Sequence, residues 1–119
     1  MLNIISKYLF YICIIAIEYL ATTTKEIEVV QNSWDKANHF IAFMVLFMLL
    51  SFGYRHLNLI KKVMLLSLFA VQIEIVQYFI PCRSFSLLDI FADMVGIGIG
   101  CVVVRALMVA FSWLVNNIN

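Results

Sequence analysis

Runs of about twenty apolar residues, separated by short clusters of charge, constrain this chain more than any other feature of its sequence. The chain has 119 residues, of which 65% are hydrophobic and only 13% are charged. A helix needs about 20 apolar residues to cross the hydrocarbon core of a bilayer. The pattern therefore predicts an all-α integral membrane protein, with room for four spans and little else. A net charge of +1 without a basic run indicates no nucleic-acid partner.

The predicted fold is a four-helix transmembrane bundle that forms a single domain over residues 1–119. We expect its helices at approximately residues 6–24, 36–55, 62–80 and 86–110. Pro81 ends the third helix, because the residue before a proline avoids helical geometry. The first run could be mistaken for a signal peptide, but Glu18 within it and the lack of a small-residue cleavage site argue against cleavage.

The orientation of the bundle follows from the distribution of lysine and arginine. With both termini in the cytoplasm, the basic residues near the spans divide into five inside and three outside: Lys7, Arg55, Lys61, Lys62 and Arg105 against Lys25, Lys36 and Arg83. Cytoplasmic loops are enriched in these residues. We therefore expect cytoplasmic termini, with the loops around Asp35 and Arg83 on the outer side of the membrane.

Acidic residues inside the third and fourth predicted helices mark a candidate site. Counting 1.5 Å of rise per residue, Glu74 and Asp93 each lie about 10 Å below the outer ends of their helices. Gln77 and Asp89 lie level with each other about one turn nearer the surface. Carboxylates within a membrane span are costly and usually functional.

Small residues continue the same two helix faces at greater depth. Ala70 lies level with Gly96, and Ser67 lies level with Gly100. Small residues let two helix backbones approach closely in lipid. We therefore expect the third and fourth helices to pack against each other through these positions.

Basic residues can balance part of the acidic charge at this depth. Arg83 in the turn above is the expected counter-ion, since its planar fork suits carboxylate or phosphate. Lys36 and His39 enter from the second helix, and one excess negative charge remains. The site should hold a proton, a cation, or a cationic or hydroxyl-rich ligand. The predicted ligand-binding residues are Lys36, His39, Glu74, Gln77, Arg83, Asp89 and Asp93.

Structural interpretations compete for some of these residues. Asp89 follows Ser86 at the spacing of a capping box and would complement the helix dipole. Lys36 could extend to the lipid headgroups instead of joining the site. The three cysteines, Cys13, Cys82 and Cys101, have no metal-binding spacing. His39 with three carboxylates is a possible set of metal ligands but forms no spaced motif, so we expect no metal site. We expect no cofactor either.

A family pattern runs through the same residues. The chain contains Glu74-x-x-Gln77, then Pro81-x-Arg83-x-x-Ser86-x-x-Asp89-x-x-x-Asp93-x-x-Gly96-x-x-x-Gly100, preceded by Asp35-Lys36-x-x-His39-Phe40. This combination resembles the VanZ-like family of small bacterial membrane proteins, and the resemblance covers roughly residues 34–100. The chain has Cys82 where the family often has glycine, and Asp93 where it often has asparagine.

The resemblance implies a multi-pass protein of the bacterial cytoplasmic membrane, in a family associated with teicoplanin resistance. It implies no particular reaction. We expect a binding protein for a membrane lipid headgroup or a lipid-linked cell-envelope precursor. The alternative is a membrane hydrolase or transferase, with Glu74 or Asp93 as general acid–base and His39 assisting. Proton or cation transport is disfavoured, because no polar relay continues through the inner half. The oligomeric state is left open.

Overall fold

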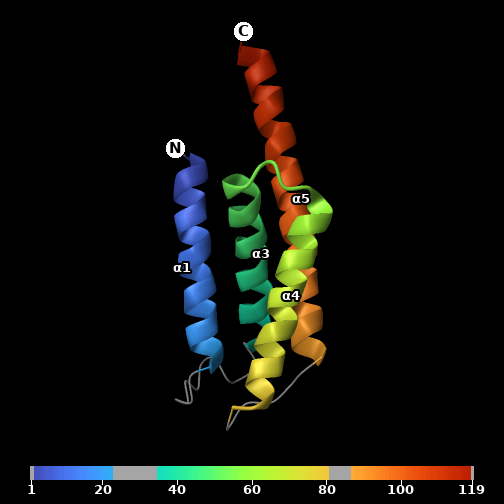
Figure 1. Ribbon diagram of the computed structural model, residues 1–119. Helices are drawn as coiled ribbons and strands as arrows, with labels where there is room; N and C mark the ends of the chain where they lie inside the picture. The colour runs from blue at the N-terminus through green and yellow to red at the C-terminus, as the bar shows by residue number, and fades with distance from the viewer. Residues whose placement is uncertain (1, 23–34, 81–86, 119) are drawn as a thin grey trace.

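The computed structural model describes residues 2–22, 35–80 and 87–118, and all regular structure in these ranges is helical. Four helices follow one another along the chain (Figure 1): α1 at Leu2–Thr22, α3 at Asp35–Gly53, α4 at Leu59–Tyr78 and α5 at Leu87–Ile118. The all-α prediction is confirmed for this part of the chain.

The helix boundaries differ from the predicted ones at both ends of the chain. α1 begins at Leu2, and α5 continues to Ile118, eight residues past the predicted end at 110. Arg105 does not end α5, because no proline or glycine follows it and the apolar run continues. At 1.5 Å per residue the 32 residues of α5 extend about 48 Å, against about 30 Å for each of the other helices.

α4 begins three residues earlier than predicted because Asn58 caps it. The Asn58 side chain accepts a hydrogen bond from the Lys61 backbone amide at 2.9 Å, which satisfies one of the amides left open at a helix start. The helix ends at Tyr78, and the Phe79 amide donates back to the Val76 carbonyl at 3.1 Å. The cap thus fixes where the chain enters α4.

The four helices run alternately up and down (Figure 1). The start of α1, the end of α3, the start of α4 and the C-terminal end of α5 share one end of the molecule. α3 lies between α1 and α5, packs most extensively against these two, and also contacts α4. The N- and C-terminal ends of the described chain therefore lie on the same side.

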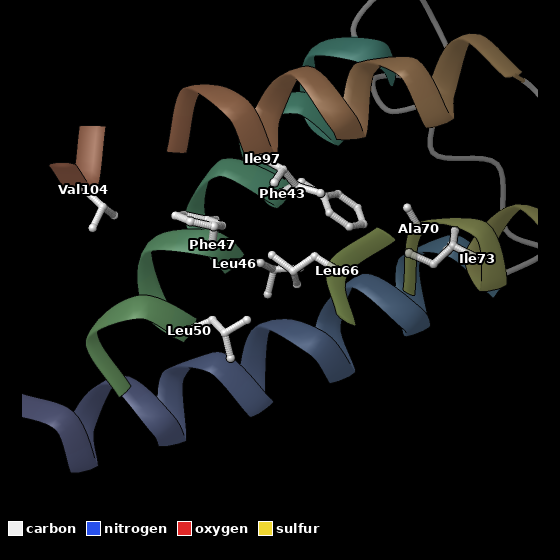
Figure 2. Packing of buried hydrophobic residues seen from close by; sticks show 10 residues of the cluster. Phe43, Leu46, Phe47, Leu50, Leu66, Ala70, Ile73, Ile97 and Val104 are labelled. Atoms are coloured by element: carbon white, nitrogen blue, oxygen red, sulfur yellow. The ribbon is translucent and has the colours of Figure 1, made fainter. Parts of the chain in front are cut away.

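The core is built around large side chains of α3. Phe43, Leu46, Phe47 and Leu50 follow one another along its inner face and are almost completely buried. Figure 2 shows them among residues of α4 and α5, namely Leu66, Ala70, Ile73, Ile97 and Val104. Such contacts stabilise helix association in lipid by van der Waals packing. α3 is thus the central helix of the bundle.

The predicted partner of the α5 glycines is wrong. A Cβ added at Gly96 would collide with the Phe40 carbonyl oxygen, and one at Gly100 would lie 3.0 Å from the Phe47 Cβ atom. Both neighbours belong to α3, so the glycines bring α5 against α3 rather than against α4. Ser67 on α4 instead donates a hydrogen bond to the sulfur of Met94 on α5 at 3.5 Å.

Two of the helices have the length and composition of membrane spans. They are the segment Asn3–Thr22, with mean hydropathy 1.7, and α5, with mean hydropathy 2.3. α3 contributes a shorter apolar segment at Asn38–Gly53. Many large apolar side chains of α1 and α5 face outward, as expected for helices surrounded by lipid.

Candidate functional site

His39 and Asp93 form a close polar contact among the described residues of the site. His39 lies one turn into α3, and its Nδ1 atom is 2.9 Å from Oδ1 of Asp93 on α5. Asp93 is completely buried, and the His39 side chain is 13% exposed. When Asp93 is ionised its carboxylate can only accept hydrogen bonds, and Nδ1–H of the ring then donates. The contact ties the start of α3 to the second turn of α5.

Asp89 and Glu74 complete a cluster around the other side of the imidazole. His39 Nε2 lies 3.8 Å from Asp89 Oδ2. One nitrogen of His39, one oxygen of Glu74 and one oxygen of Asp89 all lie within 4.8 Å of one another. Glu74 is completely buried and Asp89 is 6% exposed. The cluster therefore draws one acidic or basic group from α3, one from α4 and two from α5.

Helix periodicity and one glycine explain why these groups meet. Asp89 and Asp93 are four residues apart, so both lie on the same face of α5. Gly96 continues that face, and its missing side chain lets the α5 backbone approach the carbonyl of Phe40. Because Phe40 directly follows His39, this close approach holds the imidazole beside both aspartates.

Gln77 lies next to the cluster, but its side chain forms a hydrogen bond with α1 and not with a residue of the cluster. Its side-chain amide is buried and donates to the backbone carbonyl of Ala21 at 3.2 Å. This bond attaches α4 to the end of α1, where the last carbonyls of a helix lack internal partners. The sequence predicted that Gln77 lies at the level of Asp89. It could not predict the bond to Ala21, because every residue has a backbone carbonyl and the sequence does not distinguish this one.

A pocket of about 340 Å³ opens between α1, α3 and α4 beside the cluster. Its walls are mainly apolar, and its polar side chains are Asn38, His39 and Gln77. Small-molecule sites have this composition, in which a few polar groups fix the orientation of a mostly apolar ligand. His39 belongs to both the pocket wall and the cluster, so the pocket meets the cluster at this side chain.

The predicted site residues fall into three groups. His39, Glu74, Asp89 and Asp93 converge, and Gln77 lines the neighbouring pocket. Lys36 lies in the first turn of α3, but its side chain is outside the described part of the structure. Arg83 lies outside the described residues altogether. Asn38 was missed, although it directly precedes His39.

Two apolar helices of spanning length and a buried acidic cluster near one end are features found together in small membrane proteins. The VanZ/LLP1 family model matches residues 2–110, and the chain belongs to this family. The family resemblance is thereby confirmed, over a longer stretch than the motifs alone cover. No curated protein and no solved structure matches the chain.

Proposed function

We propose that the protein spans the bacterial cytoplasmic membrane four times, with both termini in the cytoplasm, and binds a lipid headgroup or a lipid-linked envelope precursor at its outer end. The two ends of the described chain lie on the same side of the bundle (Figure 1), which supports an even number of membrane crossings. Arg55, Lys61 and Lys62 lie in and after the α3–α4 turn on that same side, where a cytoplasmic surface would be basic.

The continuity of the apolar pocket with the polar cluster carries the binding proposal. A lipid needs an apolar surface for its chains and polar groups for its head. The pocket offers the first along Ile17, Ile41 and Phe43, and the cluster offers the second at His39. A ligand would then lie with its chain between α1, α3 and α4 and its head toward Asp89.

The charges of the outer end match a zwitterionic or hydroxyl-rich phosphate ester. The carboxylates of Glu74 and Asp89 would accept hydrogen bonds from hydroxyl or ammonium groups. Lys36 and Arg83 would supply the cationic donors that phosphate prefers. If the bound molecule is a precursor of the cell wall, a contribution to teicoplanin tolerance would follow.

The binding proposal can be tested by native mass spectrometry of protein released from mild detergents. We expect wild-type protein to retain a phosphate-containing lipid, and Arg83→Ala to lose it. Arg55→Ala is the matched control, because it removes the same side chain from the opposite end of the bundle. Wild-type protein that carries no lipid in several detergents, or equal losses in the two variants, would refute the proposal.

An enzymatic role is the second candidate, and the His39–Asp93 bond favours it. A general base is commonly held in place by a carboxylate on its far side, which is the arrangement at 2.9 Å here. Glu74 would then be the acid–base partner within the cluster. Hydrolysis or group transfer on a lipid-linked substrate should disappear in Glu74→Gln, in protein that remains folded. Unchanged turnover in that variant would exclude the role assigned to Glu74.

A further inference from the structure

The His39–Glu74–Asp89 cluster has the composition of a metal site. We propose that these three side chains bind one divalent transition-metal ion, with Asp93 as the residue that positions His39. Sequence spacing predicted no metal site, because the three donors come from three different helices. The proposal goes beyond lipid binding and does not depend on it.

The donor atoms lie close enough together to be drawn onto one ion. His39 Nε2 and Asp89 Oδ2 are 3.8 Å apart, beyond hydrogen-bonding range. With metal–ligand bonds of about 2.1 Å, two donors on one ion lie about 3.4 Å apart in a tetrahedron and at most about 4.2 Å apart. The donor atoms of the cluster lie within 4.8 Å of one another, so closure around a tetrahedral ion requires two of them to approach each other by at most about 1.4 Å.

The Asp93 contact selects the ring nitrogen that faces the other donors. Metal-binding histidines usually donate their second ring N–H to a carboxylate, which fixes the tautomer and the ring orientation. In the proposed site Nδ1–H of His39 donates to Asp93, 2.9 Å away, and Nε2, which lies 3.8 Å from Asp89, is the metal ligand. Asp93 thus acts as a positioning residue rather than as a ligand.

The donor set and the pocket indicate the kind of ion and its exposure. One imidazole nitrogen with two carboxylate oxygens suits Zn²⁺ and similar borderline ions. Three protein ligands leave at least one coordination position for an external group. His39 also lines the 340 Å³ pocket, so that position would be reachable from the pocket by a phosphate or carboxylate oxygen.

Metal binding can be measured directly on the full-length protein in detergent, after lipid is removed and metals are stripped with a chelator. We expect about one zinc ion per chain on reconstitution, and weakening of zinc affinity by at least about tenfold in His39→Ala, Glu74→Gln and Asp89→Asn. Asp93→Asn should weaken binding by about 10- to 100-fold without removing a ligand. His56→Ala is the matched control, because His56 is exposed in the α3–α4 turn.

A replacement ligand separates coordination from folding. His39→Cys with cobalt(II) should give the intense near-ultraviolet band of a cobalt–thiolate bond, which wild-type protein lacks. Wild-type protein that binds no more zinc than His39→Ala would overturn the proposal. So would a His39→Cys protein that elutes and folds like wild type but shows no thiolate band. Because lipid is removed first, zinc binding and lipid retention are read separately.

Discussion

Asp93 is a completely buried acidic residue at the polar end of the molecule. Its carboxyl group is hydrogen-bonded to His39. A hydrogen bond with a charged partner contributes about 1.5 to 3 kcal/mol, and a buried group deprived of its partner costs a similar amount. The retention of such a group inside apolar helices is typical of functional positions.

Substitution of Asp93 by asparagine should separate the contribution of the His39 contact to stability from the contribution of side-chain volume. Asp93→Asn keeps the size and loses the charge, so we expect a loss of about 1 to 3 kcal/mol in the free energy of unfolding in detergent. Asn116→Asp is a convenient control, since Asn116 is exposed near the end of α5. Equal stability of Asp93→Asn and wild type would mean that the His39 contact contributes little.

At the scale of single residues, the sequence predicted how deep each polar side chain lies along its helix. Counting the rise of a helix predicted that Glu74 and Asp93 lie at one level with His39 nearby, and the structure brings the three together. The same counting did not predict the hydrogen bond from Gln77 to the Ala21 carbonyl. The depth of a residue along a helix does not say toward which neighbouring helix its side chain points. The functions of these residues remain proposals.

At the scale of helices, the contact between α3 and α5 determines the site. Gly96 and Gly100 lie against the α3 backbone and Phe47, and this approach positions His39 beside Asp89 and Asp93. The sequence predicted a close helix contact at these glycines but assigned it to α4. Periodicity identifies the residues that share a face, whereas the neighbour of that face depends on how all four helices pack.

The glycines offer a matched comparison within one helix. Gly96→Ala places a methyl group against the Phe40 carbonyl, so we expect a loss of about 1 to 3 kcal/mol from overpacking. Gly98→Ala has no heavy atom within 4 Å of the added carbon and should be neutral or stabilise by about 0.5 to 1 kcal/mol. Thermal or denaturant unfolding in detergent would measure both. A Gly96→Ala protein as stable as Gly98→Ala would contradict the close α3–α5 approach.

At the scale of the whole molecule, the bundle has a basic end and an acidic end. The chain ends and the α3–α4 turn lie on the basic end, and the cluster lies toward the other (Figure 1). The C-terminal part of α5 projects past the other helices (Figure 1), and its side chains after Val104 are exposed. The sequence predicted four helices with both termini on one side, but not this projection.

The proposed orientation predicts the accessibility of Cys82. In a variant with Cys13 and Cys101 replaced by serine, a membrane-impermeant maleimide should label Cys82 in intact cells, because its loop faces outward. A cysteine introduced at Asn58, in the α3–α4 turn, should be labelled only after lysis. The opposite result at the two positions would invert the topology and place the cluster at the cytoplasmic surface.

The central claim is that the apolar pocket and the polar cluster form one lipid-binding site. Ala42 lines the pocket on α3, and Ala16 is exposed on α1. We predict that Ala42→Phe, which fills the pocket, abolishes the lipid retained in native mass spectrometry, whereas Ala16→Phe leaves it unchanged. Retention of the same lipid by a folded Ala42→Phe protein would contradict the account.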